Sequence, residues 1–245
     1  MIQDAIILLA GLGTRLKPLT DASHKALLTI GDKTILQRQI EALQSFGIQK
    51  FHLALGYRAD DIQNYVRNHF PDLNVAYYEN PVYAQTNTAY SLWLVIQKMP
   101  RGFLLLDGDV LFTKSLLQIF KTHADQNALL CETDPSKLDP EAVKFCTNAQ
   151  NQITQIGKAI ALSDAKGESI GIGQFQADWN RTLNAFLNTQ LQNTAHHNWY
   201  YEDAFQRIFE GQQAPAPFFV LSTGEQAWVE VDDHADLKRA QELFT

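Results

Sequence analysis

Short apolar runs alternate with amphipathic helical segments over the first half of the chain, and this alternation limits the possible folds more than any other feature. The apolar runs lie at residues 5–10, 51–55, 74–78 and 102–106. The intervening segments with helical periodicity are residues 34–46, 60–70 and 88–98. Strands that alternate with helices in this way form βαβ units. The sequence therefore predicts an α/β fold with a mixed, mostly parallel sheet flanked by helices.

The second half of the chain is less regular, but it continues the mixture of strands and helices. We expect strands at residues 128–133, 143–147, 153–156, 170–175, 218–221 and 228–231. We expect helices at residues 178–192, 201–211 and 235–244. No internal repeat, low-complexity tract or linker interrupts this pattern. Residues 1–245 are therefore expected to form a single domain.

Composition excludes some classes of partner and of location. The formal net charge is −7, whereas binding to a nucleic-acid backbone requires a basic surface. No stretch approaches the roughly 20 apolar residues of a membrane span, and the apolar run at 5–10 is too short for a secretory signal. Cys131 and Cys146 have no metal-type spacing and suit a reducing compartment. We expect a cytoplasmic protein that binds neither nucleic acid nor membrane.

A glycine-rich turn follows the first apolar run directly, as Ala10-Gly11-Leu12-Gly13-Thr14-Arg15. Glycines let backbone N–H groups approach an anion, and Arg15 and Lys25 add positive charge at the same place. The spacing matches neither the P-loop nor the dinucleotide motif. The alternative interpretation is a tight strand–helix turn with surface cations. We predict that this loop binds a nucleoside triphosphate through Ala10, Gly11, Gly13 and Thr14.

Two acidic groups follow strands that are far apart in the sequence. Asp107 and Asp109 flank Gly108 at the end of the strand at 102–106, where ligands bind in open α/β sheets. Glu230 and Asp232 lie on one face of a later strand. Such carboxylates suit Mg²⁺, although Asp is also common in turns and helix caps. With the glycine loop, the two groups favour metal-assisted phosphoryl transfer.

Several strings along the chain resemble the nucleotidyltransferase superfamily in its phosphocholine cytidylyltransferase-like branch. They are LLAGLGTRLKPLTDASHKALLTIGDKTIL at 8–36, NTAYSLWL at 87–94, LLLDGDV at 104–110, IGK at 156–158, GESIGIGQF at 167–175, YYED at 200–203 and WVEVDDHADLKRA at 228–240. The resemblance runs nearly end to end and in order. It implies a Rossmann-like core and a Mg²⁺-dependent cytidylyltransferase. The expected substrates are CTP and a small phosphorylated amino-alcohol, with phosphocholine as first choice.

The resemblance also implies roles for single residues. Asp109 would be the principal Mg²⁺ ligand, with Glu230 or Asp232 as its partner. Lys25 would serve the α-phosphate of the nucleotide and Lys158 the phosphate of the acceptor. Further residues would line the nucleotide and acceptor pockets: Leu9, Asn87 and Asp107 for the nucleotide, and Ser91 for the acceptor. Arg15 is expected to hold the outer phosphates.

The chain departs from the family pattern at two positions. The family usually has Pro-Lys where this chain has His24-Lys25, and a small residue where it has Leu9. We expect the loss of proline to loosen the approach of Lys25. Leu9 lies next to the expected base site, so the departure there weakens any inference about base preference.

Recognition of the acceptor is the least specified part of the site. A choline group calls for aromatic faces, and Tyr201 with Glu202 in the YYED string is the strongest candidate, with Glu168 as a further source of charge. Each aromatic residue is also a normal core residue. A primary amine would be served equally well by Glu202. The choice between the two acceptors stays open.

Two other functions are also compatible with the sequence. One keeps the chemistry but uses a sugar-1-phosphate with UTP, dTTP or GTP. The other is a non-catalytic nucleotide-binding regulatory module. The adjacent histidines His196 and His197 are interpreted as a solvated loop, because no third metal ligand stands nearby in the sequence.

Overall fold

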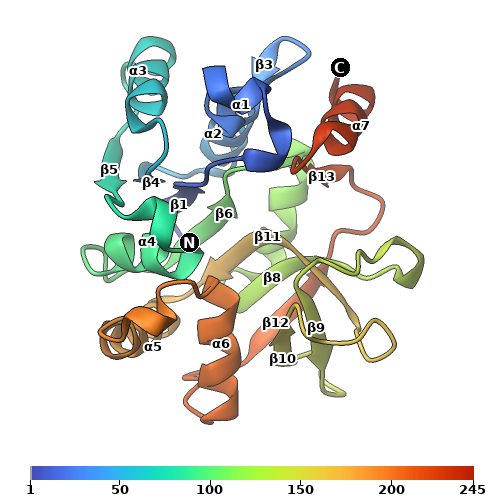
Figure 1. The fold of residues 1–245 in the computed structure, drawn as a ribbon. Coiled ribbons are helices and arrows are strands. Elements are labelled where there is room, and N and C mark those ends of the chain that lie inside the picture. The colour runs from blue at the N-terminus through green and yellow to red at the C-terminus, as the bar shows by residue number, and fades with distance from the viewer. Residues whose placement is uncertain (1) are drawn as a thin grey trace.

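A nine-stranded mixed sheet forms the centre of the protein, whose computed structural model describes residues 2–245 (Figure 1). Its parallel part has the order β6-β1-β4-β5. These strands are β1 (Asp4–Leu9), β4 (Lys50–Leu55), β5 (Val75–Glu79) and β6 (Phe103–Asp107). The order places β1 between two strands that follow it in the chain. The crevice at the carboxyl ends of β1 and β6 is therefore a topological switch point, where open α/β sheets bind ligands.

The remaining strands extend the sheet beyond β6 and are largely antiparallel. The long strand β11 (Gly167–Phe175) pairs with β6, β8 and β9 in antiparallel orientation. The others are β8 (Asn127–Glu132), β9 (Lys144–Thr147), β10 (Ile153–Gly157) and β12 (Phe218–Ser222). This arrangement confirms the mixed α/β sheet that the sequence predicts.

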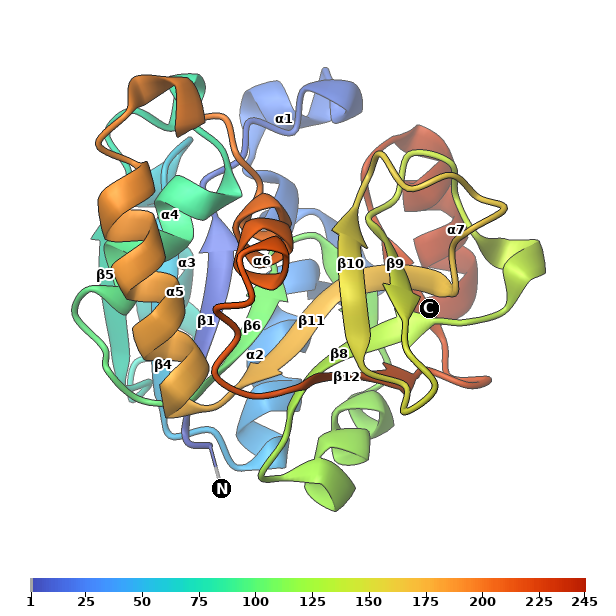
Figure 2. The same ribbon diagram turned by 90° about the horizontal axis from the view of Figure 1, so that it is seen from below.

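Helices cover both faces of the sheet (Figure 2). One face carries α4 (Thr88–Ile96), α5 (Ala177–Gln190) and α6 (Tyr201–Glu210), and the other carries α2 (Ile35–Phe46) and α3 (Ala59–His69). Within β1, Ile7 packs with α2 and α3, whereas Ile6 packs with α4, α5 and α6. Because β1 is buried on both faces, its sequence is an unbroken apolar run.

Two small two-stranded ladders complete the fold, and of their four strands only the one within residues 228–231 was predicted. The first pairs β7 (Val110–Phe112) with β13 (Trp228–Glu230), and the second pairs β2 (Thr29–Ile30) with β3 (Lys33–Thr34). The last helix, α7 (His234–Phe244), packs near them, and α1 (Leu19–Ala22) follows the glycine loop. A 3-10 segment at Lys114–His123 was also missed. Strands of two or three residues are too short to show a sequence period.

Among residues 2–245, no helix combines the length and the apolar character that a membrane-spanning segment requires. Cys131 is buried and Cys146 is half-buried, and both thiols are free.

Candidate active site

The glycine loop leaves the carboxyl end of β1 and turns sharply at Gly13. This glycine has φ +60°, a conformation that other residues adopt rarely. A Cβ added there would lie 3.0 Å from the Thr20 side chain and 3.3 Å from the Cβ of Lys25. An added Cβ at Gly11, by contrast, would meet no atom within 4 Å. The predicted phosphate loop is thus packed against Lys25 on one side and open at Gly11.

His24 ties the turn that carries Lys25 to the end of β1. Its Nδ1 accepts a hydrogen bond from the backbone N–H of Ala26 at 3.1 Å, so the ring proton is on Nε2. That Nε2–H donates to the carbonyl of Leu9 at 3.1 Å. The ring is 3% exposed. The expectation that losing the proline loosens this turn is therefore not supported, because the imidazole anchors the backbone on both sides of Lys25.

The pKa of His24 allows a test of whether its imidazole is buried and neutral in the folded protein. Burial lowers the pKa of His24 to about 4 from its ordinary 6.5. As the pH falls below 6.5, His24 becomes protonated in the unfolded chain, but in the folded protein it stays neutral down to about pH 4. The free energy of unfolding therefore decreases as the pH falls from 6.5 to about 4. We expect this group to remove roughly 2 kcal/mol of unfolding free energy between pH 7.5 and pH 5.

Urea unfolding of the wild type and of His24→Gln at the two pH values measures this effect. The variant should be less stable at pH 7.5 and should lack this component of the pH dependence. Equal pH dependence in the two proteins would rule out a buried neutral imidazole at this position.

The β7–β13 ladder brings the two acidic groups together. Val231 N–H donates to the Asp109 carbonyl at 3.0 Å, directly beyond the pairing of Glu230 with Val110. The carboxylates of Asp109, Glu230 and Asp232 supply oxygens that all lie within 4.8 Å of one another. This confirms that the two acidic groups meet, and the burial of Val229 and Val231 confirms the predicted alternation.

The ammonium group of Lys25 lies between two of these carboxylates. It lies 2.7 Å from Asp109 Oδ2 and 2.6 Å from Asp232 Oδ1. Arg15 bonds the other oxygen of Asp232, and its own side chain is 66% exposed. Burial opposes the charge on Lys25, but Asp109 and Asp232 outweigh it and raise the pKa of the ammonium above its ordinary value. The glycine loop, both cations and the carboxylates therefore form one site.

The donor set of this cluster fits a hard divalent cation such as Mg²⁺. Oxygen ligands from a few carboxylates are what Mg²⁺ takes from protein, with its remaining ligands from water and phosphate. The second carboxylate oxygen of Asp109 is buried and has no hydrogen-bond partner among residues 2–245. Loss of water and the charges of Asp109 and Asp232 raise the pKa of Glu230 to about 8. A bound cation would relieve this crowding of negative charge.

Asp107 faces α6 rather than the glycine loop. Its Oδ2 accepts a hydrogen bond from the Tyr201 hydroxyl at 3.1 Å. Burial, followed by the charges of Glu202 and Asp109, raises its pKa well above the usual range. The structure thus places Asp107 against α6, and its contact with the nucleotide stays a prediction. The ring of Tyr201 is buried and packs against Phe205, and its hydroxyl bonds Asp107, so the structure shows no free aromatic face at Tyr201.

Two other predicted residues support the backbone around the site. Asn87 caps α4, with its side chain accepting from Thr88 N–H at 2.8 Å. Ser91 is buried, and its Oγ accepts from the side chain of Asn80 at 3.1 Å. Asn80 also accepts from Val82 N–H through its amide oxygen. The contacts that the structure shows for Ser91 are structural, and its role as an acceptor ligand stays a prediction.

Glu168 and Leu9 take structural positions as well. The Glu168 carboxylate is buried and accepts from Asp139 N–H at 2.6 Å, on the β9 side of β11. The Leu9 side chain is buried in the core and lies under Gly108, where an added Cβ would be 2.5 Å from it. Its place is thus beneath the Asp-Gly-Asp turn rather than beside a base. The ligand roles of Leu9 and Glu168 stay predictions.

Gln39 is a site residue that the sequence interpretation missed. It lies on the buried face of α2, and its amide donates to the carbonyls of Asp107 and Val110 at 2.8 and 2.9 Å. These two hydrogen bonds therefore fix the backbone of the Asp-Gly-Asp turn to α2. A glutamine inside the apolar stripe between Leu36 and Leu43 is the signal that could have identified it.

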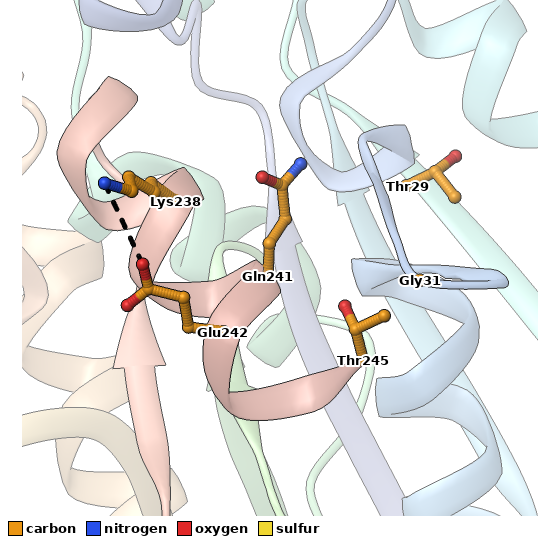
Figure 3. A pocket seen from close by; sticks show the side chains of 6 residues that line it. All are labelled: Thr29, Gly31, Lys238, Gln241, Glu242 and Thr245. Atoms are coloured by element: carbon orange, nitrogen blue, oxygen red, sulfur yellow. Dashed lines mark ion pairs between the residues drawn. The ribbon is translucent and has the colours of Figure 1, made fainter.

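Two cavities lie outside the carboxylate cluster. One, of about 550 Å³, sits between the β2–β3 hairpin and α7, and none of the predicted site residues lines it (Figure 3). Its rim includes the Lys238–Glu242 ion pair. The other, of about 730 Å³, is lined by residues of the β10 end and of α6 that include Lys158, Tyr200 and Glu202. The second cavity contains two predicted acceptor-side residues.

Known proteins resemble the chain in sequence and in fold. The family described as Nucleotidyl transferase matches residues 4–145. Choline-phosphate cytidylyltransferase from Streptococcus pneumoniae is 35% identical over 114 residues, 46% of this chain and 48% of that protein. The catalytic subunit beta of mannose-1-phosphate guanylyltransferase from Drosophila pseudoobscura is 31% identical over 141 residues, 54% of this chain and 38% of that protein. The chain thus spans half or less of the length of these two curated relatives.

The solved structure of CTP:phosphocholine cytidylyltransferase from Streptococcus pneumoniae covers the whole of both chains with a TM-score of 0.79 at 22% identity. That likeness confirms the predicted fold. The family match includes more than half of the sequence, with the glycine loop, Lys25 and the Asp-Gly-Asp turn inside it. The chain therefore belongs to the nucleotidyl transferase family.

Proposed function

We propose that this protein is a Mg²⁺-dependent cytidylyltransferase that joins CTP to a small phosphorylated amino-alcohol. The observation that carries the proposal is the cluster of Asp109, Glu230 and Asp232, with Lys25 bridging two of its carboxylates beside the glycine loop. A triphosphate needs this combination of cations, loop backbone and metal-binding carboxylates. Residues 1–245 would act as one nucleotidyltransferase domain.

The proposed reaction moves a nucleotide monophosphate onto the acceptor. An oxygen of the acceptor phosphate attacks the α-phosphorus, a new P–O bond forms, and the bond to the β-phosphate oxygen breaks to release pyrophosphate. The attacking oxygen is already anionic at neutral pH, so the step needs no general base. Arg15 would hold the outer phosphates, Lys25 would neutralise charge that develops at the α-phosphate, and Lys158 would orient the acceptor phosphate. Mg²⁺, held by Asp109 with Glu230 or Asp232, would neutralise charge on the triphosphate.

The assignment of CTP and of an amino-alcohol is supported by the names of similar proteins and by the YYED string, with phosphocholine as the reference acceptor. A sugar-1-phosphate is the rival acceptor, since the chain is also similar to a mannose-1-phosphate guanylyltransferase. The free thiols of Cys131 and Cys146 support the expectation of a cytoplasmic protein.

The test is the rate of pyrophosphate release with Mg²⁺, five nucleotides and a set of acceptors. The nucleotides are CTP, UTP, dTTP, ATP and GTP, and the acceptors include phosphocholine, phosphoethanolamine, 2-aminoethylphosphonate, glycerol phosphate and glucose-1-phosphate. We expect release with CTP and an amino-alcohol acceptor. Release with glucose-1-phosphate alone would retain the chemistry and reject the acceptor class. Bound nucleotide without release under every condition would favour a regulatory module.

A further inference from the structure

Two buried carboxylates beneath α6 each have an oxygen without a hydrogen-bond partner. Glu202 lies in the first turn of α6 and is 5% exposed, yet its Oε2 has no partner among residues 2–245. The same holds for Oδ1 of Asp107, at the end of β6. Buried polar atoms without partners are costly, because they lose their hydrogen bonds to water. The two oxygens therefore call for a donor that this chain does not itself provide.

Both carboxylates lie near the Tyr201 hydroxyl. The Tyr201 hydroxyl donates its one proton to Asp107 and lies close enough to Glu202 for the two groups to influence each other. Room for the Asp107 carboxylate is created by Gly171, where an added Cβ would lie 2.5 Å from Oδ2. A cation with hydrogen-bond donors would satisfy both carboxylates.

Glu202 also lines the cavity of about 730 Å³ that contains Lys158. The two walls of this cavity are joined, because Gln206 on α6 accepts from Ile156 N–H of β10 at 2.7 Å. Lys158 and Glu202 line this cavity together. An acceptor with a phosphate and a short cationic tail would present its phosphate to Lys158 and its tail to Glu202.

Several aromatic side chains near this cavity already contact a cation or another ring of the protein. The Arg207 guanidinium lies 4.5 Å from the ring centre of Trp199, and His196 stacks on the same indole at 4.1 Å. The Lys158 ammonium lies 4.7 Å from the ring centre of Tyr200. Tyr90 packs against His197 at 5.1 Å. A quaternary ammonium is recognised chiefly by aromatic faces, and the cations and rings that already contact these side chains compete for that role.

We propose that Asp107 and Glu202 bind an ammonium group that carries N–H donors, so that the acceptor is a phosphorylated or phosphonate primary amine rather than a quaternary one. This inference rests on the proposed function. A primary ammonium has three N–H donors for the unpartnered oxygens, whereas a trimethylammonium has none. The phosphate ester and the phosphonate share this ammonium and differ only in the group presented to Lys158.

The experiment measures kcat/KM with CTP for acceptors that differ only in methylation of nitrogen. The acceptors are phosphoethanolamine, its N-methyl and N,N-dimethyl forms and phosphocholine, with 2-aminoethylphosphonate as a second source of the primary amine. We expect kcat/KM to fall along the series, at least roughly tenfold from phosphoethanolamine to phosphocholine, because a site built to hydrogen-bond a substrate N–H rejects an analogue without it. The wild-type series needs no variant to fold.

The variant Glu202→Gln tests the named residue. It should raise the KM for phosphoethanolamine at least roughly tenfold, leave the KM for CTP unchanged, and flatten the methylation series. Glu225→Gln removes a charge from an exposed turn and serves as the matched control. Equal or greater kcat/KM with phosphocholine in the wild type, or an unchanged series in Glu202→Gln, would overturn this inference and keep the proposed function. Failure of every acceptor would overturn both.

Discussion

Asp109→Asn is expected to lower kcat by roughly a thousandfold or more while the protein stays folded. Asp109 connects several parts of the proposed site. It follows the strand end at β6, bonds Lys25 at 2.7 Å, contributes to the three-carboxylate cluster and keeps one buried oxygen free of protein partners. An asparagine keeps the shape of the side chain but removes the charge that Mg²⁺ and Lys25 require. The effect should therefore appear in turnover and in Mg²⁺ affinity together.

Steady-state kinetics as a function of Mg²⁺ concentration, with thermal unfolding alongside, checks this result. Asp72→Asn is the matched control, because Asp72 is an exposed aspartate near the amino end of β5, at the opposite end of the parallel strands. An Asp109→Asn protein with wild-type turnover and the same Mg²⁺ dependence would remove Asp109 from the metal site.

Lys25→Met is expected to lower kcat by roughly a hundredfold to a thousandfold, the range found when one preorganised donor to a developing negative charge is removed. Lys25 is largely buried between Asp109 and Asp232, with a side chain 12% exposed. Its strongly favoured charge keeps it cationic across the pH range of an assay. Methionine retains the length of the side chain and removes the charge, so the loss should fall mainly on kcat rather than on the KM for the acceptor.

Rapid-quench measurement of a single turnover separates the chemical step from product release in this variant. Lys25→Arg retains the charge and should recover part of the lost rate. If Lys25→Met changed only the KM for CTP, Lys25 would bind the triphosphate in the ground state without acting on the transition state.

The regular elements could be predicted because their signals are local. The buried run of β1 and the apolar stripe of α2, with Gly47 at its end, each carry their pattern within a dozen residues. The role of Asp109 as a metal ligand was predicted from the family resemblance and from its place after a strand, and it stays a prediction. The switch point between β1 and β6 then placed Asp109 beside the glycine loop.

Contacts between distant segments could not be predicted in the same way. Nothing local to residues 110–112 indicates that they pair with β13, and this pairing is what brings Glu230 to Asp109. The burial of Tyr201 and the hydrogen bonds made by Gln39 depend on which face of each helix meets the sheet. At residue 24 the family pattern was misleading, because an imidazole achieves through two hydrogen bonds what a rigid proline achieves through its ring.

The most direct test of the central claim is to analyse the products by mass spectrometry. The protein is incubated with CTP, Mg²⁺ and a phosphorylated amino-alcohol, and the nucleotide products are identified and counted against released pyrophosphate. The account predicts a CDP-linked product formed in equal amount to pyrophosphate, at a rate that Asp109→Asn abolishes. Hydrolysis of CTP without a linked product, or CTP that stays intact while bound, would contradict it.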